Sequence, residues 1–186
     1  MLPLGLICLT ALAAPVDLPL ANPGFEQDLV GWSVALPAKN SQFFSLDETV
    51  RRSGQKSLRV ACDDATANPW ITAPARDLAG GATYAFSAWV RGEADRSAEA
   101  ALKIEYYNAA SENTSGHYAR LVVKDGEWQR LVVEQPADAG VVKATVLLRM
   151  FGTGTLWFDD ISFARTADPP PFTLAPPRLA GAGPRQ

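Results

Sequence analysis

The sequence has few of the residue types that catalysis by a protein usually requires. Its 186 residues include one histidine, His117, and two cysteines. No G-x-S-x-G segment is present to expose a nucleophilic serine on a sharp turn. The carboxylates of Asp63-Asp64 and Asp159-Asp160 are adjacent in the chain, so on a strand they would point to opposite faces and could not flank one scissile bond. These absences predict that the protein is not an enzyme.

Charge of one sign and long hydrophobic runs are also scarce. The formal net charge is -3, and no run of basic residues offers the face that a nucleic acid or an anionic membrane would attract. The apolar N-terminal stretch ends near Ala14, short of the roughly 20 residues that span a bilayer. We therefore expect no nucleic-acid partner and no membrane insertion, and we expect the chain to act as a monomer.

The apolar N-terminal stretch has the features of a secretory signal peptide. It ends in Ala11-Leu12-Ala13, an A-x-A pattern that fits cleavage by signal peptidase. The stretch has no Lys or Arg at its start, so a buried N-terminal strand is the alternative. We predict a signal peptide over residues 1–14 and a secreted or cell-envelope-exposed bacterial protein.

Cysteine chemistry contributes little to the folded protein. Cys8 lies in the predicted signal peptide, which leaves Cys62 alone in the mature chain and excludes an intramolecular disulfide. Cys62 follows Leu58 and Val60 at a period of two residues, so it is expected to be a buried and unreactive thiol.

Turn residues recur at the intervals of about 8 to 12 residues that are typical of a sandwich or barrel of short strands. With 47% hydrophobic residues, the chain can form one sizeable core and therefore one domain, over residues 15–165. Residues 166–186 are rich in proline and glycine, and we expect them to form a disordered tail. The expected strands are 31–36, 42–46, 57–62, 70–73, 83–91, 101–107, 118–123, 129–134, 143–151 and 155–163.

Alternation of apolar and polar residues assigns faces to three of these strands. The residues expected to face inward are Tyr84, Phe86, Ala88 and Val90, then Leu102, Ile104 and Tyr106, and then Ala144, Val146, Leu148 and Met150. Those expected on the opposite face include Trp89, Arg91, Glu105, Tyr107, Arg149 and Phe151. If the three strands belong to one sheet, its outer face carries aromatic rings next to charged hydrogen-bonding groups.

A series of motifs lies in a definite order along the chain. The motifs are Asn22-Pro-Gly-Phe-Glu26, Gly31-Trp32, Ser53-Gly-x-x-Ser-Leu-Arg-Val60, Gly81-x-x-Tyr-x-Phe-Ser-Ala-Trp-Val-Arg91, Trp128 and Gly154-Thr-x-Trp-Phe-Asp-Asp-Ile-Ser-Phe163. Together they resemble the galactose-binding-like jelly rolls, and most closely the xylan- and glucan-binding carbohydrate-binding modules of bacterial glycoside hydrolases, over about residues 20–165. The resemblance implies an all-β, two-sheet antiparallel sandwich of jelly-roll type, a structural calcium ion joining the terminal strands, and a ligand cleft on one concave sheet face.

The resemblance places the calcium ligands at Glu26 and Asp159. Calcium prefers carboxylate and carbonyl oxygens, which these two regions can supply. Strict alternation would put Asp159, and not Asp160, on the same face as Ile161 and Phe163, where a buried carboxylate needs a partner. The alternative is that Glu26 caps nearby backbone amides while the two aspartates are solvated.

Polysaccharide binding is the function that the resemblance implies, and the outward residues suit it. Aromatic rings can stack on the C–H face of a sugar while polar groups hold its hydroxyls. Relatives place a binding tryptophan where this chain has Trp70. The predicted ligand-binding residues are Trp70, Trp89, Arg91, Glu105, Tyr107, Arg149 and Phe151. Exposed aromatics also occur in strands for packing alone, so a structural or protein-interaction module of the bacterial cell surface remains the alternative.

Overall fold

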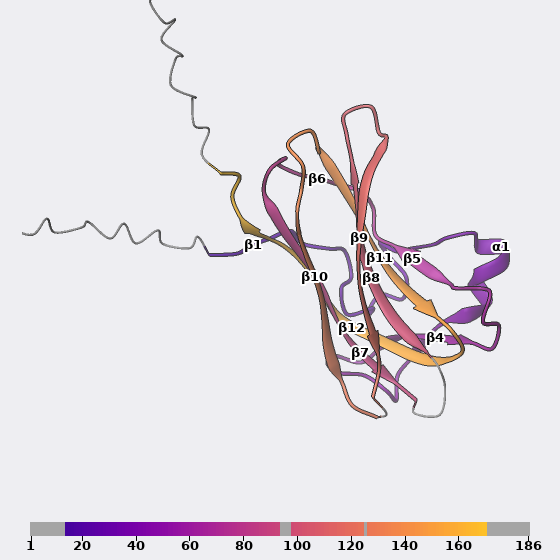
Figure 1. Ribbon diagram of the computed structural model, residues 1–186. Coiled ribbons are helices and arrows are strands. Elements are labelled where there is room, and N and C mark those ends of the chain that lie inside the picture. Colours follow the sequence, from indigo (N-terminus) through magenta and orange to yellow (C-terminus); the bar gives the residue numbers. More distant parts are fainter. Residues whose placement is uncertain (1–13, 94–97, 125, 171–186) are drawn as a thin grey trace, which may run out of the picture.

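A computed structural model describes residues 14–93, 98–124 and 126–170. The chain folds into two antiparallel sheets that pack face to face, as the resemblance implied (Figure 1). The first sheet, sheet A, has the strand order β10-β7-β12-β4-β3, with β1 paired to β12. The second, sheet B, has the order β2-β5-β11-β8-β9, with β6 paired to β11. Neighbours in each sheet are mostly distant in sequence, which is the connectivity of a jelly roll.

The strands of sheet A are β1 (Val16–Asp17), β3 (Phe44–Asp47), β4 (Ser57–Cys62), β7 (Thr83–Gly92), β10 (Gln129–Pro136) and β12 (Gly154–Ala167). Those of sheet B are β2 (Ser33–Val34), β5 (Trp70–Thr72), β6 (Arg76–Asp77), β8 (Glu99–Tyr107), β9 (Asn113–Val122) and β11 (Lys143–Phe151). The helix α1 (Pro37–Asn40) and the 3-10 turn η1 (Ser41–Phe43) link β2 to β3. No helix among the described residues is long and apolar enough to cross a membrane.

All of the predicted strands are present, and β4 and β11 have the predicted bounds. The short strands β1 and β6 and the two helical turns were not predicted, because two to four residues carry too little periodic pattern. Strand β12 continues to Ala167, so the predicted start of the tail at residue 166 is two residues early. Most of that tail, 171–186, and the predicted signal peptide up to residue 13, including Cys8, lie outside the described residues.

The core between the sheets contains the inward rows that alternation predicted. Phe86, Ala88 and Val90 of β7 have no exposed surface, and the inward residues of β8 and β11 are equally buried. Cys62 is also buried, and burial raises the pKa of its thiol, which agrees with an unreactive cysteine. The predicted faces of these three strands are therefore confirmed.

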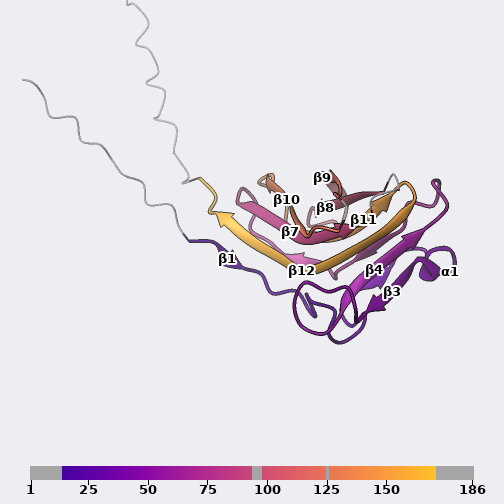
Figure 2. The same ribbon diagram turned by 90° about the horizontal axis from the view of Figure 1, so that it is seen from below.

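The three strands do not share one sheet, so the condition for a single aromatic outer face is not met. Strand β7 lies in sheet A between β10 and β12, whereas β8 and β11 are neighbours in sheet B. Figure 2 shows the two layers edge-on, with β7 and β12 in one and β8 and β11 in the other. Alternation reports which side of a strand faces the core, and it carries no information on which sheet the strand joins.

The loop after β3 is held to sheet A by a buried indole. Trp157 of β12 donates its Nε1–H to Asp47 Oδ2 at 2.8 Å. The other oxygen, Asp47 Oδ1, accepts the backbone N–H groups of Thr49 and Val50 at 2.8 and 3.0 Å. Burial opposes ionisation of Asp47, but the hydrogen bonds from Val50, Thr49 and Trp157 outweigh it and lower its pKa far below the ordinary value.

We expect Asp47→Asn to lower the free energy of unfolding at pH 7 by about 1 to 3 kcal/mol, the range for hydrogen bonds to a charged group. A depressed pKa in the folded state stabilises the fold above the unfolded pKa of about 3.9, and this contribution is lost as the pH falls through the folded value. Urea denaturation should therefore show the gap between wild type and variant narrowing below about pH 4. The exposed Asp77 supplies the control Asp77→Asn, expected to change stability by less than about 0.5 kcal/mol. A gap that is constant with pH would contradict the role of the Asp47 charge.

Candidate functional site

Five of the predicted ligand-binding residues share the outer face of sheet B. Trp70 of β5 lies opposite Arg149 of β11, and Phe151 follows Arg149 on the same face. Glu105 and Tyr107 extend this face along β8, opposite Thr145 and Lys143 of β11. All five side chains are partly exposed, as their outward position predicts. The cross-strand register, and not proximity in sequence, brings them together.

Arg149 is the centre of this face. Its guanidinium carbon lies 4.7 Å from the ring centroid of Trp70 and 4.9 Å from that of Phe151. It donates hydrogen bonds to the hydroxyl of Tyr118 at 2.8 Å and to the carbonyl of Asn68 at 3.3 Å. A planar guanidinium with contacts on both faces and edges fixes the neighbouring rings in place.

Two cations that the sequence prediction left out border these rings. The guanidinium of Arg120 lies 4.0 Å from the Phe151 ring centroid, and the Lys103 ammonium lies 4.9 Å from that of Tyr118. Tyr118 itself is 37% exposed. The signal that could have identified Arg120 and Tyr118 was the alternation in β9, where both point away from the core.

Glu105 forms the polar end of the same face. Its Oε1 accepts a hydrogen bond from the ammonium of Lys103, and its Oε2 accepts one from the hydroxyl of Tyr107 at 3.0 Å. Burial is the main cause that raises the pKa of Tyr107, and the nearby Glu105 carboxylate is the next, so the Tyr107 hydroxyl stays protonated and acts as a donor. The face thus combines flat apolar surface with paired donors and acceptors, the arrangement that sugar rings and hydroxyls require.

Trp89 and Arg91 do not belong to this face, so the predicted grouping of seven residues is wrong. Both lie on β7, with their side chains on the outer face of sheet A. The guanidinium carbon of Arg52 sits 3.8 Å from the Trp89 ring centroid, and Arg52 also forms an ion pair with Asp160. Arg52, which belongs to the loop before β4, thus covers one face of the Trp89 ring, and this loop is hydrogen-bonded to Asp159 of the same sheet.

The predicted metal ligands lie close together, with Asp159 on β12 of sheet A and Glu26 in the segment between β1 and β2. A Cβ on Gly24 would lie 3.7 Å from Asp159 Oδ1 and 3.8 Å from Glu26 Oε1, so both carboxylates border the same small volume. The amide of Ile161 donates to the carbonyl of Pro23 at 3.0 Å, which joins the N-terminal segment to the last strand. The two ends of the domain therefore meet at these acids.

Asp159 is buried for a reason different from the predicted one. It lies opposite Trp89 of β7, on the outward row of β12, whereas Ile161 and Phe163 face the core. The change of side is produced by a bulge, because the pairing skips a residue of β12 before Ser162 and Asp160 has a φ of 48°. The prediction that Asp159 shares a face with Ile161 and Phe163 is wrong. Asp159 nevertheless has no exposed surface, because the loop before β4 covers it.

The surroundings of Asp159 fit a cation. Its carboxylate accepts hydrogen bonds from the backbone amides of Arg52, Ser53 and Asp160 at 2.8, 3.2 and 2.7 Å. No cationic side chain in the described part of the chain forms an ion pair with it. Burial raises the pKa of Asp159, with the amides acting in the opposite direction. A wholly buried carboxylate without a positive partner is the environment in which a bound cation stabilises most.

Glu26 is positioned for both of the roles expected from the sequence, which are binding of a metal ion and capping of backbone amides. Its Oε1 accepts the amides of Gln55 at 2.9 Å and Lys56 at 3.3 Å, which is the capping role. The alternative also required Asp159 and Asp160 to be solvated, and this is not observed, because Asp159 is buried. Residues 14–93, 98–124 and 126–170 contain no group of three or more His, Cys, Asp or Glu side chains arranged around a metal site. A calcium ion at these two carboxylates would therefore need backbone carbonyl oxygens or water as further ligands.

A family model described as a carbohydrate binding domain matches residues 20–138 of the chain. No curated protein matches the chain. The match covers more than half of the chain and includes the strands that carry Trp70, Glu105 and Tyr107.

Solved structures with the same fold include several carbohydrate-binding modules. The CBM22-1 xylan-binding domain of Paenibacillus barcinonensis Xyn10C is 15% identical, with a TM-score of 0.55 over 84% of this chain and 99% of that one. TmCBM61, solved in complex with β-1,4-galactotriose, is 18% identical, with a TM-score of 0.56 over 78% and 97%.

A further match is to the CBM22-1 and GH10 modules of Clostridium thermocellum endo-1,4-β-D-xylanase 10B, complexed with xylohexaose. It is 20% identical, with a TM-score of 0.62 over 81% of this chain. The chain spans 29% of that protein and 20% of a bacteriophage CBA120 tailspike protein that it also resembles. At these identities the likeness establishes the jelly-roll fold.

Gly54 tests how closely the loop before β4 is fitted to Glu26. Its φ is 58°, and a Cβ there would lie 2.0 Å from Glu26 Oε1. We expect Gly54→Ala to lower the free energy of unfolding by about 2 to 3 kcal/mol, of which the left-handed backbone accounts for about 1 to 2. In a Glu26→Ala background the same change should cost less, because the clash is gone. Chemical denaturation of the four proteins of this double-mutant cycle gives the coupling.

Gly140 provides the matched control, since a Cβ there meets no atom within 4 Å. Gly140→Ala should leave stability within about 0.5 kcal/mol of the wild type or raise it slightly. An equal cost of Gly54→Ala with and without Glu26 would refute the close fit.

Proposed function

The chain belongs to the carbohydrate binding domain family, and we propose that it binds a β-1,4-linked polysaccharide on the outer face of sheet B. The observation that carries this proposal is the cluster of Trp70, Arg149, Phe151 and Tyr118 from β5, β11 and β9, in which one hydrogen-bonding cation contacts three aromatic side chains on one sheet face. The family is non-catalytic, so the outcome of binding is attachment of the protein to its ligand.

In the proposed site, the aromatic rings and the polar groups contribute to binding in different ways. The faces of Trp70 and Tyr118 would contact the C–H surfaces of successive sugar units, and their burial would supply most of the binding free energy. Glu105, Tyr107 and Lys103 would exchange hydrogen bonds with hydroxyl groups and so select among sugars. Two of the similar structures are complexes with xylohexaose and with β-1,4-galactotriose, which supports a β-1,4-linked pyranose chain as the ligand class.

An extracellular location and a structural calcium ion complete the proposal. The A-x-A sequence at residues 11–13 supports export of the protein to the outside of the cell, where polymeric ligands occur. Glu26 and Asp159 would hold calcium at the junction of the N-terminal segment and β12. A bound divalent cation compensates the buried charge of Asp159, and the loop amides of Arg52 and Ser53 orient that carboxylate.

Substitution of one tryptophan on each sheet tests the location of the ligand. Trp70→Ala should weaken binding of xylohexaose about tenfold or more, equivalent to about 1.4 kcal/mol, because a stacking surface is removed. Trp89→Ala should leave affinity within about twofold, since Trp89 lies on sheet A beneath Arg52. Isothermal titration calorimetry measures both, with circular dichroism to establish that each variant is folded.

Loss of binding in Trp89→Ala with retention in Trp70→Ala would overturn the assignment to sheet B. Wild-type protein that binds none of a panel of xylan, glucan, mannan and galactan oligosaccharides would overturn the proposed function. That result would favour the structural or protein-interaction module.

Removal of calcium should destabilise the protein. Calcium at about 100 times its dissociation constant would stabilise the fold by about 2.7 kcal/mol, which raises the melting temperature by about 5 to 10 °C for a domain of this size. Asp159→Ala and Glu26→Ala should each abolish this increase. Asp160→Asn is the matched control, because Asp160 is partly exposed and paired with Arg52, and it should retain the increase. Differential scanning calorimetry measures these melting temperatures after exhaustive chelation and again after calcium or magnesium is restored. Equal melting temperatures with and without calcium would exclude the calcium site.

A further inference from the structure

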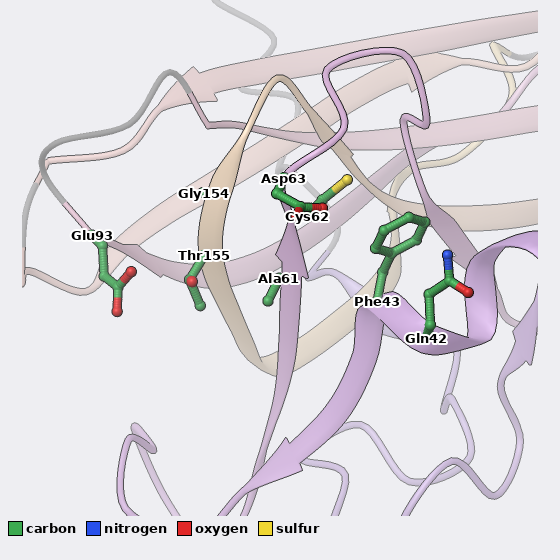
Figure 3. Close-up of a pocket in the computed structure, with 8 residues that line it drawn as sticks. All are labelled: Gln42, Phe43, Ala61, Cys62, Asp63, Glu93, Gly154 and Thr155. Carbon is green, nitrogen blue, oxygen red and sulfur yellow. The ribbon is translucent and has the colours of Figure 1, made fainter.

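A hollow opens on the other sheet, away from the face described above. It has a volume of about 430 Å³ and lies on the outer side of sheet A, where β4 ends and β12 begins. Ala61 of β4 and Thr155 of β12 are cross-strand partners and form its floor. Figure 3 shows Phe43 and Gln42 on one side of this pair and Glu93 on the other. Its volume lies within the range of about 300 to 1,000 Å³ that is usual for small-ligand sites.

A second hollow of about 460 Å³ adjoins the first and shares Gln42 and Phe43 with it. Lys39 and Asn40 of α1 line one side, and Asp64 and the residues after it line another. These walls are fixed: Asn40 is buried and donates to the carbonyl of Ala35 at 2.6 Å, and Asp64 Oδ1 accepts the amide of Thr66 at 2.8 Å. Gln42 and Phe43 separate the two hollows, which together are called the groove below.

The groups that line the groove suit a polyhydroxylated ligand. Thr155 is 7% exposed, and its hydroxyl forms no hydrogen bond with the described residues, although it lines the first hollow. Asp63 and Glu93 are exposed at the rim and can each accept two hydrogen bonds from vicinal hydroxyls. Phe43 is half-buried and offers an apolar surface between the hollows.

The charge of the first hollow limits the class of sugar that it takes. Among the described residues that line this hollow, the charged ones are the carboxylates Asp63 and Glu93. Two carboxylates at one rim repel an anionic ligand and accept hydrogen bonds from a neutral one. Uronic-acid chains are therefore disfavoured.

We propose that this groove, bounded by Phe43, Ala61, Thr155, Asp63 and Glu93, is a second saccharide-binding site that takes an uncharged oligosaccharide. The proposal takes its ligand class from the proposed function, but its residues lie on the opposite sheet. Two sites on opposite sheets would let one domain contact two polysaccharide chains, which raises the overall avidity when both are engaged.

Backbone amide chemical shifts distinguish the two sites in one experiment. Titration of the 15N-labelled protein with xylohexaose, and separately with cellohexaose, should perturb amides of Ala61, Thr155 and Glu93 in addition to those of sheet B. Ala61→Trp fills the floor and should weaken the response at Thr155 and Glu93 about tenfold or more, while leaving the response of sheet B unchanged. The matched control is Ala85→Trp, on the outer face of sheet A in β7 but outside the groove.

A second variant removes charge without adding volume. Asp63→Asn with Glu93→Gln should weaken the neutral oligosaccharides at the groove and allow tetragalacturonate, which the wild type should not bind there, to perturb the same amides. Perturbations confined to sheet B, or groove perturbations that persist in Ala61→Trp, would overturn the second site. Groove perturbations without any on sheet B would instead overturn the proposed function and leave the second site standing.

Discussion

The buried carboxylate of Asp159 is the constraint on which the arrangement of sheet A depends. It sits on the central part of β12, and its hydrogen bonds bring the backbone of the loop before β4 down onto the sheet. The N-terminal segment reaches the same place through the contact between Pro23 and Ile161. Without these contacts a charge would be buried with no partner, at a cost of several kcal/mol. One residue therefore couples three segments that are far apart in sequence.

This constraint also determines which part of the outer face of sheet A is covered by the protein itself. The loop that satisfies Asp159 carries Arg52, whose guanidinium lies against Trp89 and pairs with Asp160. The middle of the outer face of sheet A is thereby occupied by the protein itself. On sheet B, Arg149 contacts the carbonyl of Asn68 in the loop before β5, but Trp70 and Arg149 both remain partly exposed. The contacts that close the sandwich and the proposed ligand face on sheet B thus lie on opposite sheets.

The sequence predicts local features of this fold well and long-range ones poorly. Alternation identified the buried rows of β7, β8 and β11 because each strand keeps a strict period of two. It failed at β12, where the bulge at Asp160 shifts the side chains, since a single extra residue leaves no mark in a pattern of apolar residues.

Sheet membership is the second limit on prediction from the sequence. Trp89 and Tyr107 both occupy outward positions on alternating strands but lie on different sheets, because strand pairing is decided by contacts across the whole domain. Arg120 and Lys103 join the site only through the register of β8, β9 and β11. The motifs at the chain ends were sufficient for the fold and for the position of Glu26 beside Asp159, and insufficient for the composition of the ligand face.

The contacts of Arg149 determine how strongly such a face can bind. In the free protein its guanidinium already contacts Trp70 and Phe151 and donates to Tyr118, so these side chains are ordered before a ligand arrives. Ordering a flexible side chain on binding costs about 0.5 to 1.5 kcal/mol, and this cost is largely avoided here. The same contacts occupy donors that a sugar hydroxyl would otherwise use. A ligand that stacks on the rings without displacing Arg149 therefore gains the most, which favours a flat, extended chain over a compact or branched one.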